Sequence, residues 1–139
     1  MTETTVQHAI KALLWGSTVE QDGKTFAPYG VYEASPELIK RISKEWEQFS
    51  DEAMELGFDP EEHREQMVNK PTDGDEWAHC AHDWIFTRQR RDPTEYGFEE
   101  PGKWFEPWGE KLTKLTLYGL KNEELYLYID DNNQISAES

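Results

Sequence analysis

The sequence is poor in cysteine and has no long apolar run. Its 139 residues include one cysteine, so no internal disulfide can form and nothing favours an oxidising compartment. No stretch approaches the roughly 20 apolar residues that a membrane helix needs. The first residues also lack the basic region and cleavage pattern of a secretory signal. We therefore expect a cytoplasmic protein without a membrane partner.

Basic side chains are also scarce. The chain has 14 Lys and Arg against 29 Asp and Glu, a formal net charge of −15. Residues 51–110 alone carry a net charge of −11. Such an excess opposes direct binding to nucleic acid, because phosphate ligands are normally Lys and Arg. It favours a basic protein partner, and the simpler alternative is a charged shell that keeps the protein dissolved.

Aliphatic residues are few, but aromatic residues are not. Only 36% of the residues are hydrophobic, whereas 13% are aromatic and six are Trp. Disordered chains are poor in aromatic residues, and a few large rings can bury as much surface as many small side chains. The sequence therefore predicts one folded domain, residues 1–139, with an aromatic core.

Helical spacing is clearest in the first half of the chain. Apolar residues at helical intervals predict helices over 6–15 and 36–56. Ser35 is the expected N-cap of the second helix, and Gly57 the residue that ends it. Its apolar stripe would hold Leu38, Ile42, Trp46, Phe49, Ala53 and Leu56. Residues 59–62 resemble the start of another helix.

The second half mixes helix and strand patterns. We expect a short helix over 75–82, a strand over 84–88 and its return at 104–105. A helix over 107–118 and a half-buried strand over 124–130 would follow. These elements predict an α+β fold with a small antiparallel sheet of about three strands, packed by three to five helices.

Residues 79–92, HCAHDWIFTRQRRD, gather most of the reactive side chains. His79, Cys80, His82 and Asp83 have ligand-type groups, but their spacing fits no structural zinc pattern. A His beside an Asp can suggest acid–base catalysis, yet adjacent residues do not face each other on a helix or strand. The simpler reading is that Asp83 caps a segment or pairs with Arg88, which would then be an internal tie.

The same region resembles a widespread, uncharacterised family of small tailed-phage proteins. The resemblance runs through Leu14–Thr18, Asp59–Glu61, Ala81–Gln89, Gly102–Thr113 and Leu125–Asn132. The family typically carries a His-Asp-Phe-Trp-Leu-Thr-Arg motif, and the resemblance implies a phage accessory protein made in the cytoplasm of an infected host cell.

One part of the family pattern is missing. A Gly/His-rich turn is replaced here by the longer segment Arg90–Pro101, so any catalytic histidine of that turn would be lost. The retained residues that we expect to be structural are His82, Asp83, Trp84, Thr87, Arg88, Trp104 and Gly109.

Together these features predict a non-enzymatic inhibitor that mimics DNA. It would bind a basic host protein, such as a nuclease, a restriction or defence protein or a transcription component, and it would need no metal or cofactor. The alternative is a small metal-dependent or acid–base enzyme centred on His79, His82 and Asp83. The expected contact residues are Asp51, Glu52, Glu55, Asp59, Glu61, Glu62, Glu65, Glu95, Glu99 and Glu100.

Overall fold

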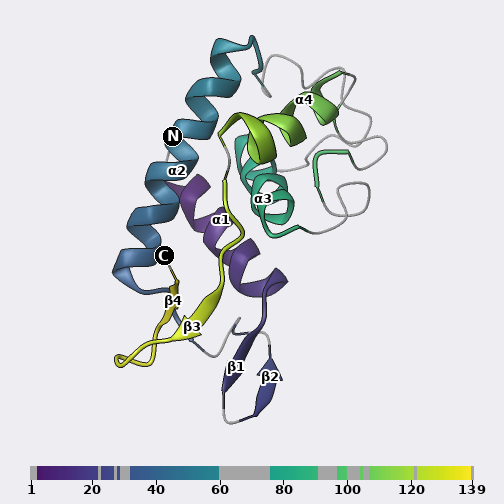
Figure 1. The fold of residues 1–139 in the computed structure, drawn as a ribbon. Helices are drawn as coiled ribbons and strands as arrows, with labels where there is room; N and C mark the ends of the chain where they lie inside the picture. Colours follow the sequence, from purple (N-terminus) through teal and green to yellow (C-terminus); the bar gives the residue numbers. More distant parts are fainter. Residues whose placement is uncertain are drawn as a thin grey trace.

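Among the residues that the structure describes, the fold combines four α-helices with two short β-hairpins (Figure 1). The computed structural model describes residues 3–21, 23–26, 28, 32–59, 76–90, 97–99, 104, 107–120 and 122–138. The elements are α1 (Glu3–Gly16), β1 (Val19–Gln21), β2 (Lys24–Phe26), α2 (Pro36–Glu55), α3 (Glu76–Arg88), α4 (Trp108–Lys114), the π-helical turn η2 (Leu115–Gly119), β3 (Leu127–Ile129) and β4 (Ile135–Ala137). The predicted α+β class is confirmed, with the strands divided between two antiparallel pairs, β1–β2 and β3–β4.

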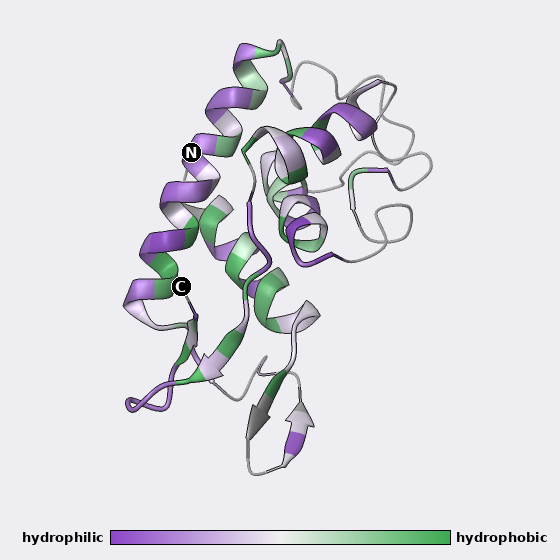
Figure 2. Cartoon of the chain, in the orientation of Figure 1, coloured by the Kyte–Doolittle hydropathy of each residue, from purple (hydrophilic) through white to green (hydrophobic). Residues whose placement is uncertain are grey.

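Helix α2 forms where its sequence predicts it. The Ser35 hydroxyl accepts a hydrogen bond from the Leu38 N–H at 3.1 Å, which satisfies one of the free donors of the first turn. The predicted stripe is buried from Leu38 to Ala53. In Figure 2, hydrophilic and hydrophobic residues alternate along this helix. Gly57 adopts a φ of 98°, a conformation that favours glycine, so the helix ends here as expected.

Leu56 does not belong to the buried stripe. Its side chain is 54% exposed, so the prediction that it joins the core is wrong. The reason is local: α2 ends at Glu55, and Leu56 is the cap residue from which the chain turns away at Gly57. The predicted helix start over 59–62 lies almost wholly outside the described residues.

Helix α3 overturns the predicted strand over 84–88. Trp84, Ile85 and Phe86 are consecutive and all fully buried, with no alternation between a buried and an exposed face. A run of rings and β-branched residues resembles a strand in sequence, but a helix packed on several sides buries the same run. Consequently His82 and Asp83 lie inside a helix and not at a junction between helix and strand.

Helix α1 packs closely against α3. The predicted helix over 6–15 is confirmed and extends from Glu3 to Gly16. At Gly16 the backbone comes so close to the Phe86 ring that a Cβ atom would overlap it. Trp15 meets the same ring edge-on, with centroids 5.9 Å apart. The missing side chain of Gly16 therefore sets how closely these helices approach.

Aromatic rings fill the space between α2, α3 and α4. Trp46 of α2 lies 5.4 Å from the Trp84 ring and 5.5 Å from the Phe49 ring. Phe58, just after α2, packs 5.1 Å from Trp108 and 5.6 Å from Trp104. The predicted aromatic core is thus the contact surface of three helices.

The chain after α3 differs in detail from expectation. Trp104 lies in a bend, so a returning strand at this residue is wrong, and Phe105 lies outside the described residues. The predicted helix over 107–118 is α4 continued by η2, in which Tyr118 is 70% exposed. The expected strand over 124–130 contains β3.

Strand β4 connects the last hairpin to the start of α2. The Ile135 carbonyl accepts from the Ser35 N–H, and the Ile135 N–H donates to the Glu33 carbonyl, both at 2.8 Å. The Ser136 hydroxyl lies 2.7 Å from the Ser35 hydroxyl. Residues about a hundred positions apart are therefore joined at the cap of α2.

We predict that Gly16→Ala destabilises the protein although alanine favours helices. The added methyl group would push the Phe86 ring out of a close-packed site, at a cost of about 1–3 kcal/mol. Urea unfolding followed by circular dichroism measures this loss. Gly119→Ala is the control, because a Cβ there meets the movable Leu115 Cδ1 atom at 3.0 Å. Equal losses for both variants would contradict the proposed contact.

Candidate functional site

Of the predicted acidic residues that the structure describes, three lie in the last two turns of α2 and Asp59 follows that helix, whereas Glu99 lies beside α4. Asp51, Glu52 and Glu55 are all exposed, while Asp59 and Glu99 are half-buried. The other five, Glu61, Glu62, Glu65, Glu95 and Glu100, lie outside the described residues.

Charge is distributed unevenly along α2. Its first half carries Lys40, Arg41 and Lys44, whereas its second half carries Glu47 and the three exposed carboxylates, with no basic residue in the last turn. The C-terminal end of a helix is the negative end of its dipole, where each added carboxylate costs about 0.3–1 kcal/mol. These carboxylates therefore do not stabilise the helix that carries them.

Two apolar side chains lie among the carboxylates. Met54 is 44% exposed and Leu56 is 54% exposed. Residues three and four apart are neighbours on a helix, so these side chains adjoin the acidic ones. We name this surface the α2-end patch; it consists of Asp51, Glu52, Met54, Glu55 and Leu56.

Asp83 is a structural carboxylate rather than an accessible one. It is fully buried, and its Oδ2 atom accepts from the Trp104 indole N–H at 2.6 Å. The expectation that it caps a segment or pairs with Arg88 is wrong, because it lies within α3 and Arg88 pairs with Glu45. Asp83 thus connects α3 to the Trp104 bend.

His82 is the more exposed member of the histidine–aspartate pair. Its Nδ1 atom lies 3.5 Å from Asp83 Oδ1, and its ring stands edge-on to Phe86 with centroids 4.4 Å apart. His79 is half-buried and Cys80 is buried. Within the described part of the chain, no three His, Cys, Asp or Glu side chains gather closely enough to hold a metal ion.

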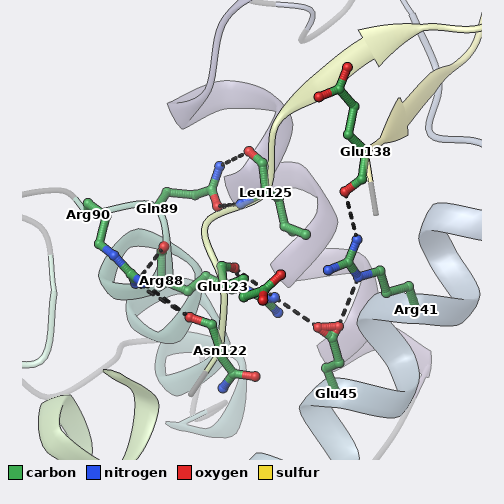
Figure 3. A network of polar contacts seen from close by, with 9 residues as sticks. All are labelled: Arg41, Glu45, Arg88, Gln89, Arg90, Asn122, Glu123, Leu125 and Glu138. Carbon is green, nitrogen blue, oxygen red and sulfur yellow. Dashed lines mark hydrogen bonds and ion pairs between the residues drawn. The ribbon is translucent and has the colours of Figure 1, made fainter. Parts of the chain in front are cut away.

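Arg88 joins three parts of the fold (Figure 3). Its Nη2 atom donates to Glu45 of α2 at 2.8 Å, and Nε and Nη2 donate to the Glu123 carbonyl at 3.1 and 3.0 Å. The guanidinium also lies 5.0 Å from the centroid of the Trp84 ring. Burial lowers the pKa of Arg88, and the Glu45 carboxylate opposes that shift.

Gln89 and Arg90 extend the same network. The Gln89 side-chain amide accepts from the Leu125 N–H at 2.7 Å and donates to the Leu125 carbonyl at 2.8 Å, as a neighbouring strand would. Arg90 donates to the carbonyls of Arg88 and Asn122. Thus the buried Arg88, the half-buried Gln89 and the exposed Arg90 all donate to backbone carbonyls of residues 122–125, and sequence reasoning missed Gln89 because its role depends on where residue 125 lies.

The remaining residues of the family-like motif also serve the interior. Trp84 and Thr87 are buried in α3. At Gly109 a Cβ atom would lie 2.7 Å from the Phe98 carbonyl oxygen, so α4 can approach that segment only without a side chain here. The described residues of the motif therefore contribute to how α3 and α4 are held.

Comparison of the chain with protein families, curated proteins and solved structures found no match. Among the described residues, none of the helices is both long and apolar enough to cross a membrane.

We predict that Arg88→Met lowers the free energy of unfolding by about 3 kcal/mol, because it leaves the Glu123 carbonyl and one side of Glu45 without a donor. Arg41→Met is the matched control, since Arg41 binds the same Glu45 carboxylate at 3.1 Å but is part-exposed. Its expected loss is about 1 kcal/mol or less. Denaturant unfolding of both variants tests the difference, and losses of similar size would refute it.

Proposed function

We propose that the protein is a non-enzymatic, acidic inhibitor that binds a basic host protein in place of DNA. The observation that carries the proposal is the exposed group of carboxylates at the C-terminal end of α2, together with the net charge of −15. Carboxylates grouped on a rigid helix can occupy the positions of phosphates in a basic groove. The resemblance to small phage proteins supports an origin in which host nucleases, restriction or defence proteins and transcription proteins are targets.

The position of the acids favours binding over a purely solubilising role. Solubility requires a net charge but no particular position for it. Carboxylates near the N-terminal end of a helix would cost the fold less stability than carboxylates near its C-terminal end. Here Glu52 and Glu55 lie at the opposite end, without a basic neighbour in the last turn. Carboxylates that destabilise their own helix have an explanation if a binding partner neutralises them.

The exposed apolar side chains favour a protein as the partner. Met54 and Leu56 adjoin the carboxylates, and a protein surface can cover such side chains whereas a small cation cannot. Charge would then increase the rate of encounter with the basic partner, and apolar contact would slow dissociation.

The alternative, a metal-dependent or acid–base enzyme centred on His79, His82 and Asp83, has less support. A catalytic carboxylate must reach its substrate, but Asp83 is fully buried and its Oδ2 atom is held by Trp104. Elemental analysis of the purified protein provides a direct test, since one equivalent of zinc or iron would favour the enzyme.

We predict that neutralising the α2-end patch reduces partner binding about tenfold or more. The test variant is Asp51→Asn, Glu52→Gln, Glu55→Gln, which removes three carboxylates and preserves side-chain size. The control variant is Glu33→Gln, Glu123→Gln, Glu138→Gln, which makes the same change in net charge at three exposed residues elsewhere. If binding depends on where the carboxylates lie and not on net charge alone, only the first variant should lose it.

The measurement is a tagged pull-down from infected host cells at two salt concentrations. The captured protein is then tested for release of double-stranded DNA when the untagged chain is added. We expect capture to weaken with salt, because screening acts over about 8–10 Å at moderate ionic strength. Equal losses in both variants, capture that persists at high salt, or undiminished DNA binding would each count against the proposal.

A further inference from the structure

The outer face of α2 carries a row of charged side chains, which we name the α2 charge row. Five exposed residues at helical spacing form it: Lys40, Lys44, Glu47, Asp51 and Glu55. The row lies on the side of the helix opposite the buried stripe. At a rise of 1.5 Å per residue it is about 22 Å long. Figure 1 shows α2 along one edge of the fold, so the row faces away from the other elements.

The charges of the row are grouped by sign. Lys40 and Lys44 form its basic half, and the three carboxylates form its acidic half. Residues of the row that are four positions apart therefore have like charges, which destabilise a helix. No member of the row forms an ion pair with any residue that the structure describes. The described part of the fold thus leaves these charges without opposite partners.

A second copy of the row is complementary to the first when it runs in the opposite direction. Consider a two-fold axis that passes between residues 47 and 48. Lys40 and Glu55 are equally far from this axis along the helix, and so are Lys44 and Asp51. Two antiparallel copies therefore bring each of these pairs of unlike charge together twice. Dimers in which both copies use the same surface are the commonest protein oligomers.

The ends of the helix also suit the antiparallel direction. The C-terminal end of α2 is the negative end of its dipole, and its last turn holds no basic residue. Lys40 of the second copy would lie at that end, where a cation is favourable. Met54 is exposed beside Glu55, and the aliphatic stem of the same Lys40 would cover it.

The order of the charges distinguishes among possible occupants of the whole row. A uniformly basic segment would meet repulsion from Lys40 and Lys44, and a uniformly acidic one would meet it from the carboxylates. Only a segment that carries both signs in reverse order matches the full length. A second copy of the chain has that order by symmetry.

We propose that two copies of the chain associate through antiparallel α2 charge rows, and that a basic partner displaces the second copy. The contact covers Asp51, Met54 and Glu55 of the α2-end patch. Self-association therefore regulates access to the patch. This regulation rests on the proposed function, whereas the pairing of the two copies does not.

Several effects limit the strength of the pairing. Each copy has a net charge of −15, although charges farther apart than about 8–10 Å are largely screened at moderate ionic strength. The two Glu47 carboxylates lie beside the two-fold axis and repel each other. One helix from each copy also buries less area than a standard protein interface. We therefore expect a weak dimer with a dissociation constant of about 0.1 mM, which a tighter partner would replace.

Two charge-reversal variants test the pairing by sedimentation equilibrium. Lys40→Glu, Lys44→Glu makes the whole row acidic, and Asp51→Lys, Glu55→Lys makes it basic except at Glu47. Each variant alone should associate at least tenfold more weakly than the unmodified chain, because like charges then face each other. An equimolar mixture of the two should associate at least as well as the unmodified chain, since an acidic row then faces a basic one.

Net charge alone predicts a different order of affinities. Asp51→Lys, Glu55→Lys changes the net charge from −15 to −11 and would then strengthen association. The unmodified chain should dimerise at about 1 mM and 0.15 M salt. Absence of association at that concentration, or no recovery of association in the mixture, would overturn the proposal. Circular dichroism checks that both variants keep the helix content of the unmodified chain.

Dilution of the unmodified chain gives a measurement that needs no variant. In NMR spectra recorded from about 1 mM to 0.01 mM, the amide signals of Lys44 and Asp51 should shift as the dimer dissociates. The amide of Trp84, which is buried in α3, is the internal reference and should not shift. Concentration-independent signals at residues 44 and 51 would contradict the proposed contact.

Failure of the proposed function would be distinguishable from failure of the pairing. Lys40→Glu, Lys44→Glu leaves every carboxylate of the α2-end patch in place, so it should still capture the host protein although it no longer associates with itself. If no host protein is captured but the mixed variants associate, the proposed function fails and the self-association stands. Capture without association of the mixed variants would retain the α2-end patch and refute the dimer.

Discussion

The buried guanidinium of Arg88 is the interaction on which the arrangement of the fold depends. It is 0% exposed, yet it binds Glu45 of α2 and the carbonyl of Glu123, and it lies over Trp84 of its own helix. Removing such a charge from water is costly, and the cost is offset only when several partners are correctly placed. Helix α2, the end of α3 and the segment before β3 therefore have to meet in one relative position for the charge to be accommodated.

Local sequence signals predicted the parts of the fold that depend on neighbouring residues. Helix α2 has a cap at Ser35, a stripe from Leu38 to Ala53 and a terminating glycine, all within one short segment. The second half of α3 could not be predicted in this way. Trp84, Ile85 and Phe86 favour a strand locally, and only packing against α1, α2 and the segments around Trp104 and Trp108 makes a helix preferable.

In the candidate site too, some features follow from the local sequence and others depend on residues far away in the chain. The number of carboxylates follows from composition, but the unfavourable position of Glu52 and Glu55 relative to the helix dipole depends on where α2 ends. The role of Gln89 required the position of Leu125, a residue 36 positions away. The sequence indicated that residues 79–92 were unusual, because their reactive groups are gathered there. It indicated that Arg88 would be an internal tie, but not that Asp83 binds Trp104 or that Gln89 and Arg90 bind the backbone of residues 122–125.

The bond between Ser35 and Ser136 has a consequence for the order of events during synthesis. These hydroxyls are separated by 101 positions, and the backbone bonds of Ile135 to residues 33 and 35 are equally remote in the chain. A ribosome adding 5–20 residues per second needs about 5–20 s to make that interval. During this time the cap of α2 has no β4 beside it. The carboxylates of the nascent helix would repel neighbouring nascent chains, so the same charges that cost stability in the finished fold could protect its unfinished form from aggregation.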